Sequence, residues 1–360
     1  MIITDHHQKG EKLPKPLALI YTPMVSGSAL AWFFSRELAG KFNAPISGIK
    51  SRLELAAIGT IADQLPLTGV NRSIAKYGLA SLEKTKRPGL VALYKSAGIK
   101  QIGPYEVGFI IAPRINSMGR IKHGLESLRL ICTTDKLRAA RLAAGIDEVN
   151  SERQNIVDKV VKHALEKANK KSPYVIVLAD ESYHEGVIGL AAAKLVEKFY
   201  RPSIVISKNK DISKASARSI AGFNIIEAIR SLDKYYIEGG GHPMAAGFSI
   251  ETKNIPVFTE KINILAKKVL SDEILQKKLH IDCEIGFDLI GADLVDVISG
   301  LSPTGIGNPE PVFESKNVEI VDSRLVGKDG KHVKLKMKQN EQILDSIFFG
   351  GGEIYSKLTP

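Results

Sequence analysis

The chain has 360 residues, of which 44% are hydrophobic and 25% are charged, and its formal net charge is +11. This composition is typical of an ordinary globular protein with room for two or three domains. No apolar run approaches the roughly 20 residues of a membrane span, so a membrane protein is not expected. The opening MIITDHHQKG has neither a basic leader nor an apolar signal core. Two separated cysteines, Cys132 and Cys283, favour a reduced, cytoplasmic setting.

The positive charge favours a polyanionic partner, above all a nucleic acid. A solvated lysine-rich surface is the alternative that charge alone leaves open. The first 130 residues predict an α/β fold, with a short strand at Leu17–Tyr21, a helix at Ala29–Leu38 and an apolar segment at Leu53–Ala62. From Asp135 to about Lys170, apolar residues recur at helical spacing, which predicts a long helix connecting two domains.

A second α/β unit is predicted after this helix. Tyr174–Ala179 and Ser203–Ser207 have the continuous apolar character of buried strands, and Val187–Phe199 between them predicts a helix. After Leu270 the pattern becomes mostly β, with strands expected at 281–285 and 318–321. Arg324–Lys338 predicts a hairpin that turns at Lys328-Asp329-Gly330, because Asp-Gly is a strong turn signal.

Asp5, His6 and His7 directly follow the apolar pair Ile2-Ile3, at the expected end of a strand. Ligands bind at that edge of α/β sheets. A carboxylate beside two imidazoles suits Mn²⁺, Zn²⁺ or Fe²⁺, although a solvated histidine pair on a loop is the alternative. Asp63 ends the apolar segment Gly59-Thr60-Ile61-Ala62-Asp63. A buried, unpartnered carboxylate is costly, so this residue is either a second metal ligand or a helix-end Asp.

Three further segments carry groups that suit phosphate binding. Ala112–Arg120 places two arginines and an asparagine among turn formers, and Ser216–Ser219 follows a predicted strand. Gly239–Gly247 is a predicted glycine-rich loop around His242, and successive N–H groups in such a loop can form an anion nest. Arginine adds bidentate phosphate recognition. A flexible surface loop is the alternative interpretation of the glycines.

Seven motifs follow one another along the chain: DHH, GTIAD, APRINSMGR, HEGVIG, SARS, GGGHPMAAG and PTGIGNPEPVF. In order and rough spacing this series resembles the RecJ single-strand-specific exonucleases of the DHH phosphoesterase superfamily. The resemblance covers nearly the whole chain. It implies a DHH catalytic domain and a DHH-associated domain joined by a long helix, followed by an oligonucleotide-binding (OB) β-barrel. It also implies 5′ to 3′ degradation of single-stranded DNA with two divalent ions, Mn²⁺ or Mg²⁺.

The resemblance also implies roles for individual residues. His6, Asp63 and Asp5 would be metal ligands, and His7 would support the metals or contact the scissile phosphate. The residues expected to bind substrate from the two walls of a cleft are Arg114, Asn116, Arg120, Arg218, Ser219, Gly240, Gly241 and His242. The chemistry would be two-metal hydrolysis, in which the ions generate hydroxide and stabilise charge on the attacking and leaving oxygens.

The expected fold class is α/β with four parts. These are the C-terminal portion of a DHH domain (1–134), a connector helix (135–170), a DHH-associated substrate-binding domain (171–268) and an incomplete OB domain (275–360). RecJ-like enzymes carry an Asp-x-Asp motif and another Asp upstream of DHH, whereas only four residues precede Asp5 and no Asp-x-Asp occurs in the chain. We therefore expect a truncated chain that is nearly inactive by itself.

Two rival functions stay open on the sequence alone. One is a DHH-type enzyme that hydrolyses oligoribonucleotides, cyclic dinucleotides or pyrophosphate, although such relatives typically end after the glycine-histidine segment. The other is a single-strand nucleic-acid-binding module without catalysis. The expected partners are single-stranded DNA and, by resemblance, a single-strand-binding protein and a helicase, for a cytoplasmic monomer that has no membrane contact.

The segment His332–Lys338 alternates apolar and basic residues with period two. Val333, Leu335 and Met337 are expected to face a core. Lys334, Lys336 and Lys338 would share the opposite face, either as a track for single-stranded DNA or as protection of an edge strand.

Overall fold

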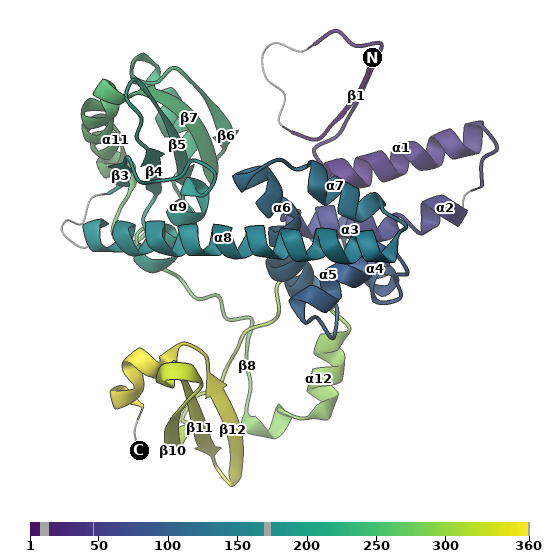
Figure 1. Cartoon of the computed structure of the whole chain (residues 1–360). Coiled ribbons are helices and arrows are strands. Elements are labelled where there is room, and N and C mark those ends of the chain that lie inside the picture. Colours follow the sequence, from purple (N-terminus) through teal and green to yellow (C-terminus); the bar gives the residue numbers. More distant parts are fainter. Residues whose placement is uncertain (8–13, 46, 169–173, 359–360) are drawn as a thin grey trace. The chain divides into compact units, whose positions relative to one another are not determined.

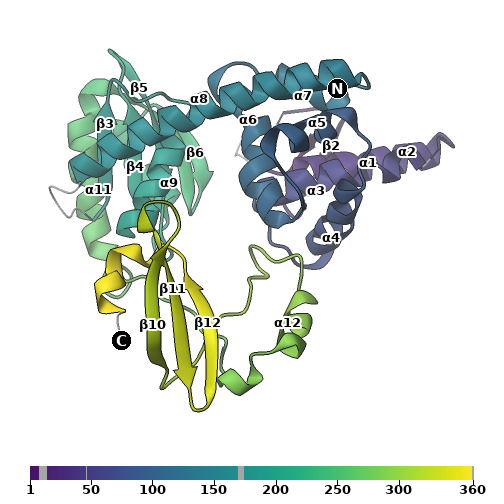
Figure 2. The ribbon, with the colours of Figure 1, turned by 60° about the horizontal axis from the view of Figure 1, so that its bottom comes forward.

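The computed structural model describes residues 1–7, 14–45, 47–168 and 174–358 (Figures 1 and 2). The chain forms two compact units, one made of residues 1–82 and 279–360 and the other of residues 83–278. In the described ranges, no helix has both the length and the apolar character needed to cross a membrane. Each unit is described separately below.

The N-terminal part of the first unit starts with two parallel strands, β1 (Ile2–Asp5) and β2 (Ala18–Tyr21), which place Asp5 opposite Tyr21. The predicted strand and the predicted helix after it are confirmed, and Ser26 caps the helix by accepting a hydrogen bond from the N–H of Ala29. Small and branched side chains form a shared core between the helices. The helices are α1 (Gly27–Lys41), α2 (Ser47–Lys50), α3 (Leu53–Ala62) and α4 (Gly69–Glu83).

The C-terminal part of the first unit is mostly β, as predicted. Strands β10 (Glu319–Val326), β11 (His332–Gln339) and β12 (Gln342–Phe348) form an open antiparallel sheet, and the hairpin around Lys328-Asp329-Gly330 is confirmed. Because β11 pairs on both sides, the edge-strand interpretation of its lysines is wrong. The remaining elements are β8 (Cys283–Glu284), α12 (Ala292–Ser299) and β9 (Phe313–Glu314).

The second unit begins with helices that pack on the N-terminal half of the long helix α8 (Lys136–Ala168) (Figure 1). The predicted connector helix matches α8, and residues 169 and 170 lie outside the described residues. The segment Ala112–Arg120, expected among turn formers, is instead helical, because a π-helical turn leads directly into it. The elements are α5 (Pro88–Ala97), the π-helix η1 (Glu106–Ile111), α6 (Ala112–Ile121) and α7 (Leu125–Cys132).

The second half of this unit is a five-stranded mixed sheet in the order β3-β4-β5-β7-β6, in which only β3 and β4 are parallel. Helix α9 packs between one face of the sheet and α8, and α10 and α11 cover the other face with a core around Phe258 (Figure 1). The strands are β3 (Ile176–Asp180), β4 (Ser203–Ser207), β5 (Ile212–Arg218), β6 (Glu238–His242) and β7 (Ala245–Glu251). The helices are α9 (Ile188–Phe199), α10 (Ile225–Arg230) and α11 (Ile255–Val269).

Two expected loops of this unit are strands. Ser216–Arg218 forms the end of β5 itself rather than a segment after a strand. The glycine-rich segment is a hairpin of β6 and β7 that turns at Pro243-Met244, because its backbone pairs with β7 along its length. Gly241 is needed there: its φ is +153°, and a Cβ would lie 2.3 Å from the Ala245 carbonyl oxygen. Its amides therefore form a ladder and not an anion nest.

Candidate functional site

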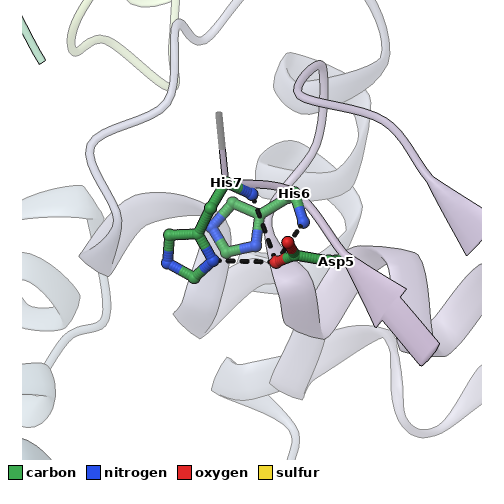
Figure 3. Close-up of side chains that lie close together, drawn as sticks. All are labelled: Asp5, His6 and His7. Atoms are coloured by element: carbon green, nitrogen blue, oxygen red, sulfur yellow. Dashed lines mark hydrogen bonds and ion pairs between the residues drawn. The ribbon is translucent and has the colours of Figure 1, made fainter. Parts of the chain in front are cut away.

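The first candidate site lies where β1 ends, in the first unit (Figure 3). Asp5 Oδ1 accepts hydrogen bonds from the backbone N–H of His6 at 2.8 Å and of His7 at 3.2 Å, and pairs with His7 Nδ1 at 2.8 Å. The bond from the His7 ring, more than the two backbone bonds, lowers the pKa of Asp5. Among the residues that the structure describes, these three form the one His, Cys, Asp or Glu group whose ligand atoms all lie within 4.8 Å.

Asp63 joins this group from the end of helix α3, although it lies 57 positions after His6 in the sequence. It is the C-cap of α3, as the helix-end interpretation predicts, and its Oδ2 lies 2.8 Å from His6 Nε2. The helix-end interpretation is therefore confirmed, and the metal-ligand interpretation stays a prediction. Two ligand atoms bound to one ion at about 2.1 Å and at a right angle lie about 3 Å apart, so this spacing fits a shared divalent ion. We call Asp5, His6, His7 and Asp63 the metal cluster.

The position of His6 depends on a close approach to helix α1. A Cβ at Gly27, the first residue of α1, would lie 3.1 Å from His6 Nδ1. Gly59, four residues before Asp63 on α3, is equally confined: a Cβ there would lie 1.9 Å from Ser28 Oγ. Glycine at these positions lets β1, α1 and α3 converge, which brings His6 and Asp63 within reach of each other.

The second candidate site is a hollow of about 790 Å³ in the second unit. Arg120 comes from the last turn of α6 and Arg218 from the end of β5, so a helix and a strand far apart in sequence meet here. We call it the arginine hollow. Its lining residues are Gly119, Arg120, Glu185, Gly186, Ile188, Gly189, Lys214, Ala215, Ser216, Arg218, Glu238, Gly239, Gly247, Phe248 and Ser249.

The two arginines of the hollow are held by neutral oxygen atoms. Arg120 Nη1 donates to the Gly186 carbonyl at 3.3 Å, and Arg218 Nη1 donates to Ser216 Oγ at 3.3 Å and to the Ala217 carbonyl at 2.8 Å. Burial, with a contribution from the charge of Arg120, lowers the pKa of Arg218. A guanidinium stays protonated in proteins, so Arg120 and Arg218 both carry a positive charge. A bound anion would offset the repulsion between these two charges.

The glycines of the HEGVIG motif explain how the hollow forms. A Cβ at Gly186 would lie 2.2 Å from the carbonyl oxygen of Arg120, so only glycine lets α6 end against this turn. A Cβ at Gly189, in the first turn of α9, would lie 2.9 Å from Ser216 Oγ and 3.2 Å from Arg218 Nη2. The Arg218 guanidinium therefore lies beside the N-terminus of α9, where free N–H groups favour an anion.

The sequence did not single out Arg153 of helix α8 or Lys214 of β5. Burial lowers the pKa of Arg153, and the charges of Arg120 and Arg114 lower it further, so three arginines influence one another. Lys214 lines the hollow, but its Nζ lies 3.7 Å from Glu238 Oε1 and 2.7 Å from Ser249 Oγ. The long helix and the strand showed no local motif at these positions, so only the tertiary fold reveals them.

The other residues predicted to bind substrate lie outside the lining of the hollow. Arg114 Nε bonds to Asp147 Oδ1 at 2.8 Å, and the Arg114 side chain is only 17% exposed, so it ties α6 to α8. Ser219 is buried and donates to the Phe223 carbonyl at 2.6 Å. Asn116 and His242 are exposed. The full set that does not line the hollow is Arg114, Asn116, Ser219, Gly240, Gly241 and His242.

The three lysines of β11 occupy one face of a central strand. Val333 and Leu335 are buried at 0% and 6% exposure, which confirms the predicted inward face. Lys336 stands opposite Asp322 on β10 and Asp345 on β12, and Lys334 Nζ lies 3.7 Å from Asp345 Oδ1. Acidic neighbours therefore offset part of the positive charge of this face.

Comparison with known proteins gives two matching domain families, the DHHA1 domain over residues 171–268 and the RecJ OB domain over residues 281–360. The single-stranded-DNA-specific exonuclease RecJ of Bacillus subtilis is 35% identical over 100% of this chain and 47% of its own length. The protein of the same name from Thermus thermophilus is 30% identical over 94% of this chain and 50% of its own length. The chain thus spans about half the length of these curated relatives.

Solved structures agree with these sequence matches. The crystal structure of RecJ in complex with Mn²⁺ from Thermus thermophilus has a TM-score of 0.85 and 26% identity, covering 96% of this chain and 57% of that chain. A crystal structure of exonuclease RecJ bound to manganese is 31% identical, with a TM-score of 0.64, and covers 77% of this chain and 71% of that chain. Fold, DHH cluster and matched domains define an α/β protein of the DHH class. Within that class, the chain belongs to the RecJ family.

Proposed function

We propose that this chain serves the hydrolysis of single-stranded DNA in the 5′ to 3′ direction with Mn²⁺ or Mg²⁺. The observation that carries the proposal is that one chain holds both the metal cluster and the arginine hollow. The carboxylates and imidazoles of the first suit a divalent cation such as Mn²⁺, and the arginines of the second suit a phosphate. The names of the relatives, single-stranded-DNA-specific exonucleases, support the choice of substrate, and a role in DNA repair and recombination follows from the family.

In this proposal His6, Asp63 and Asp5 hold divalent metal. The 2.8 Å contact between His6 and Asp63 supports this, as do the ligand atoms of Asp5 and His6, which lie within 4.8 Å of each other. Bound divalent ions supply hydroxide at neutral pH and stabilise charge on the attacking and leaving oxygens. His7 donates its ring hydrogen bond to Asp5, which keeps that carboxylate ionised and oriented. The chain's own contribution is therefore to fix the ligand atoms at the end of β1.

The arginine hollow would hold phosphates of the strand. Arg218 lies beside the N-terminus of α9, and Arg120 adds a second charge at the rim of the same hollow. Charge-assisted hydrogen bonds from arginine to phosphate are roughly twice as strong as neutral ones. Arg114, Asn116 and the Gly240-Gly241-His242 segment stay proposed substrate contacts, with exposed Asn116 and His242 accessible to a ligand.

A second candidate function is binding of single strands without cleavage. The metal cluster contains two carboxylates, Asp5 and Asp63. Two-metal hydrolysis needs enough ligands to hold two ions, and these residues do not supply a full set. Residual binding of one ion with little turnover is the corresponding outcome for this chain alone.

A nuclease assay on the full 360-residue chain tests both candidates. A 5′-phosphorylated, fluorescent single strand with a blocked 3′ end is incubated with Mn²⁺, beside the variants Asp63→Ala and, as a control, Asp211→Asn, which changes an exposed carboxylate of the second unit. Metal-dependent release of nucleotides from the 5′ end that is lost only in Asp63→Ala supports hydrolysis. Tight binding without release supports the binding function. Cleavage of short oligoribonucleotides or cyclic dinucleotides in preference to DNA would overturn the proposal.

The proposed partners go further than the substrate. A single-strand-binding protein and a helicase are proposed on the family resemblance, as are a monomeric state and a cytoplasmic location. Copurification of the full-length protein from its host on single-stranded DNA tests the first two, and light scattering tests the third.

A further inference from the structure

The motif Pro303-Thr304-Gly305-Ile306-Gly307-Asn308 has no role in the function proposed above. In the structure it forms a closed turn in the first unit: the Gly305 N–H donates to the Asn308 carbonyl at 2.8 Å, and the Asn308 N–H donates back to the Gly305 carbonyl at 3.1 Å. Asn308 Nδ2 also donates to the Leu301 and Pro303 carbonyls at 2.9 and 3.0 Å. The turn therefore keeps its shape through its own bonds.

This turn docks on the segment that follows Asp63. The N–H of Leu67, which is only 3% exposed, donates to the Ile306 carbonyl at 2.6 Å. A Cβ at Gly305 would lie 2.8 Å from Leu67 Cδ1, and a Cβ at Gly307 would lie 3.0 Å from Pro66 Cβ. Gly307 also has a φ of +74°, in the left-handed region. The two segments thus meet through one backbone hydrogen bond and through close packing, in which a Cβ at Gly305 or Gly307 would force its neighbour to shift.

A second contact comes from Arg72, five residues after Leu67, in the first turn of helix α4. Arg72 of α4 donates through Nη2 to the Gly300 and Leu301 carbonyls at 3.1 and 2.9 Å. These carbonyls follow the C-terminus of α12, where a positive charge is favourable. Residues 64–72 are therefore held to residues 300–308 at two points.

Only three residues separate Asp63 from Leu67. Gln64 leaves helix α3 with a φ of +56°, the Leu65 N–H bonds back to the Thr60 carbonyl at 3.3 Å, and Pro66 has a fixed φ. Because the connecting segment is short and restrained, fixing the position of Leu67 also restrains the position of Asp63, whose Oδ2 contacts His6.

We propose that the turn Gly305–Asn308 is a positioning clamp for Asp63, so that the C-terminal part of the first unit sets the geometry of the metal cluster. The clamp rests on the proposed function, in which Asp63 is a metal ligand. It acts through the backbone of residues 64–67 and touches neither metal nor substrate.

The test compares alanine substitutions, in the full chain, at two glycines that have nearly the same positive φ, Gly307 at +74° and Gly350 at +78°. Gly307→Ala introduces a Cβ against Pro66, whereas Gly350→Ala places one at φ +78° with nothing within 4 Å. Hydrogen exchange of residues 60–68 reports the clamp itself, and titration with Mn²⁺ reports the metal cluster. We expect Gly307→Ala to exchange about tenfold faster there and to bind Mn²⁺ about tenfold more weakly, as loss of a supporting group does at metal sites. Gly350→Ala should change neither quantity.

The variants Arg72→Met and Asp63→Ala complete the test. Arg72→Met releases the second contact without altering the turn, so it should move both readouts in the same direction even if Gly307→Ala fails to fold. Exchange of residues 60–68 that stays at the wild-type rate in Gly307→Ala and Arg72→Met would overturn the clamp. Faster exchange with unchanged Mn²⁺ affinity would overturn its positioning role, provided that Asp63→Ala weakens Mn²⁺. If Asp63→Ala leaves Mn²⁺ binding unchanged, the metal cluster itself is wrong, whatever the clamp does.

Discussion

The metal cluster and the arginine hollow differ in how their residues come together. Three of the four cluster residues are adjacent in sequence, and their carboxylate and imidazole groups already bond to one another. The hollow draws its charges from α6 and β5, about a hundred residues apart, and its two arginines have only neutral oxygen partners within the described residues. The cluster is thus internally satisfied, whereas the hollow has positive charge that a ligand would neutralise.

This comparison predicts that the two regions respond to different substitutions. The largest effect expected in the hollow is on DNA binding by Arg218→Ala, which removes charge-assisted bonds worth roughly 1.5–3 kcal/mol. Affinity for single-stranded DNA should fall about 10- to 100-fold, while Mn²⁺ affinity stays the same. Fluorescence anisotropy with a labelled oligonucleotide measures the first and Mn²⁺ titration the second. Arg230→Ala, at an exposed arginine of α10, is the control. Equal DNA affinity in both variants would contradict a phosphate-binding hollow.

Gly27→Ala is expected to have the opposite result, with weaker Mn²⁺ binding and unchanged affinity for single-stranded DNA. Its Cβ would lie 3.1 Å from His6 Nδ1, so the imidazole must shift by a few tenths of an ångström, which disturbs its 2.8 Å contact with Asp63. Mn²⁺ affinity should fall about tenfold, the effect typical of losing the support of a metal ligand. In the control Gly40→Ala, on the same helix α1, the Cβ meets nothing within 4 Å, so metal binding should not change. Equal Mn²⁺ titrations for the two variants would show that His6 tolerates the shift.

A smaller effect is expected on the basic face of β11. Each phosphate contact on a single strand contributes roughly 0.7 to the slope of log K against log salt. Replacing Lys334, Lys336 and Lys338 by glutamine should therefore flatten the slope by about 1.4 to 2.1 if two or three of them touch phosphates. Anisotropy over a range of NaCl concentrations measures the slope. A slope that stays the same would mean that Asp322 and Asp345 already neutralise this face.

The smallest effect concerns Tyr183, next to the HEGVIG motif. Its buried hydroxyl has no hydrogen-bond partner among the described residues, and burial, with a contribution from the charge of Asp180, raises its pKa to about 12. Its ordinary pKa is about 10. Because the folded state holds the proton more tightly, stability is present below pH 10 and is lost as pH rises towards 12.

Tyr183→Phe should therefore be neutral or stabilising by about 1 kcal/mol at pH 8. Its advantage over the wild type should grow between pH 10 and 12. Urea unfolding at a series of pH values gives both free energies. An advantage that stays constant over this range would show that the hydroxyl titrates alike in the folded and unfolded protein, as an exposed ring does.

The structure brings together the residues that the sequence predicted as metal ligands, whereas it disperses those predicted to bind substrate. The apolar strand before Asp5 and the apolar segment before Asp63 carried a signal in local hydropathy, and the long helix α8 followed from periodicity. For the predicted substrate-binding residues, local patterns gave less indication of where the fold places them. Gly240 and His242 belong to a hairpin outside the hollow, and Arg153 and Lys214 reach their positions only through the packing of α8 and the register of β5.

The same limit explains the glycines. In the sequence, Gly186 stands just before a predicted helix, Gly189 lies inside that helix and Gly307 belongs to a motif rich in proline and glycine. In the structure each permits one close approach, to the Arg120 carbonyl, to the Arg218 guanidinium and to Pro66. Such contacts join segments distant in sequence, so no local pattern could have predicted which neighbour each glycine meets.

The central claim is that metal binding belongs to the cluster and phosphate binding to the hollow. Titration of the full chain with Mn²⁺, followed by the paramagnetic resonance signal of the free ion, tests it most directly. Outer-shell substitutions at metal sites typically cost about 10- to 100-fold in affinity, so loss of a direct ligand in Asp63→Ala should cost about 100-fold or more. Arg218→Ala should titrate as the wild type does. An Asp63→Ala chain that binds Mn²⁺ as tightly as the wild type would contradict the account.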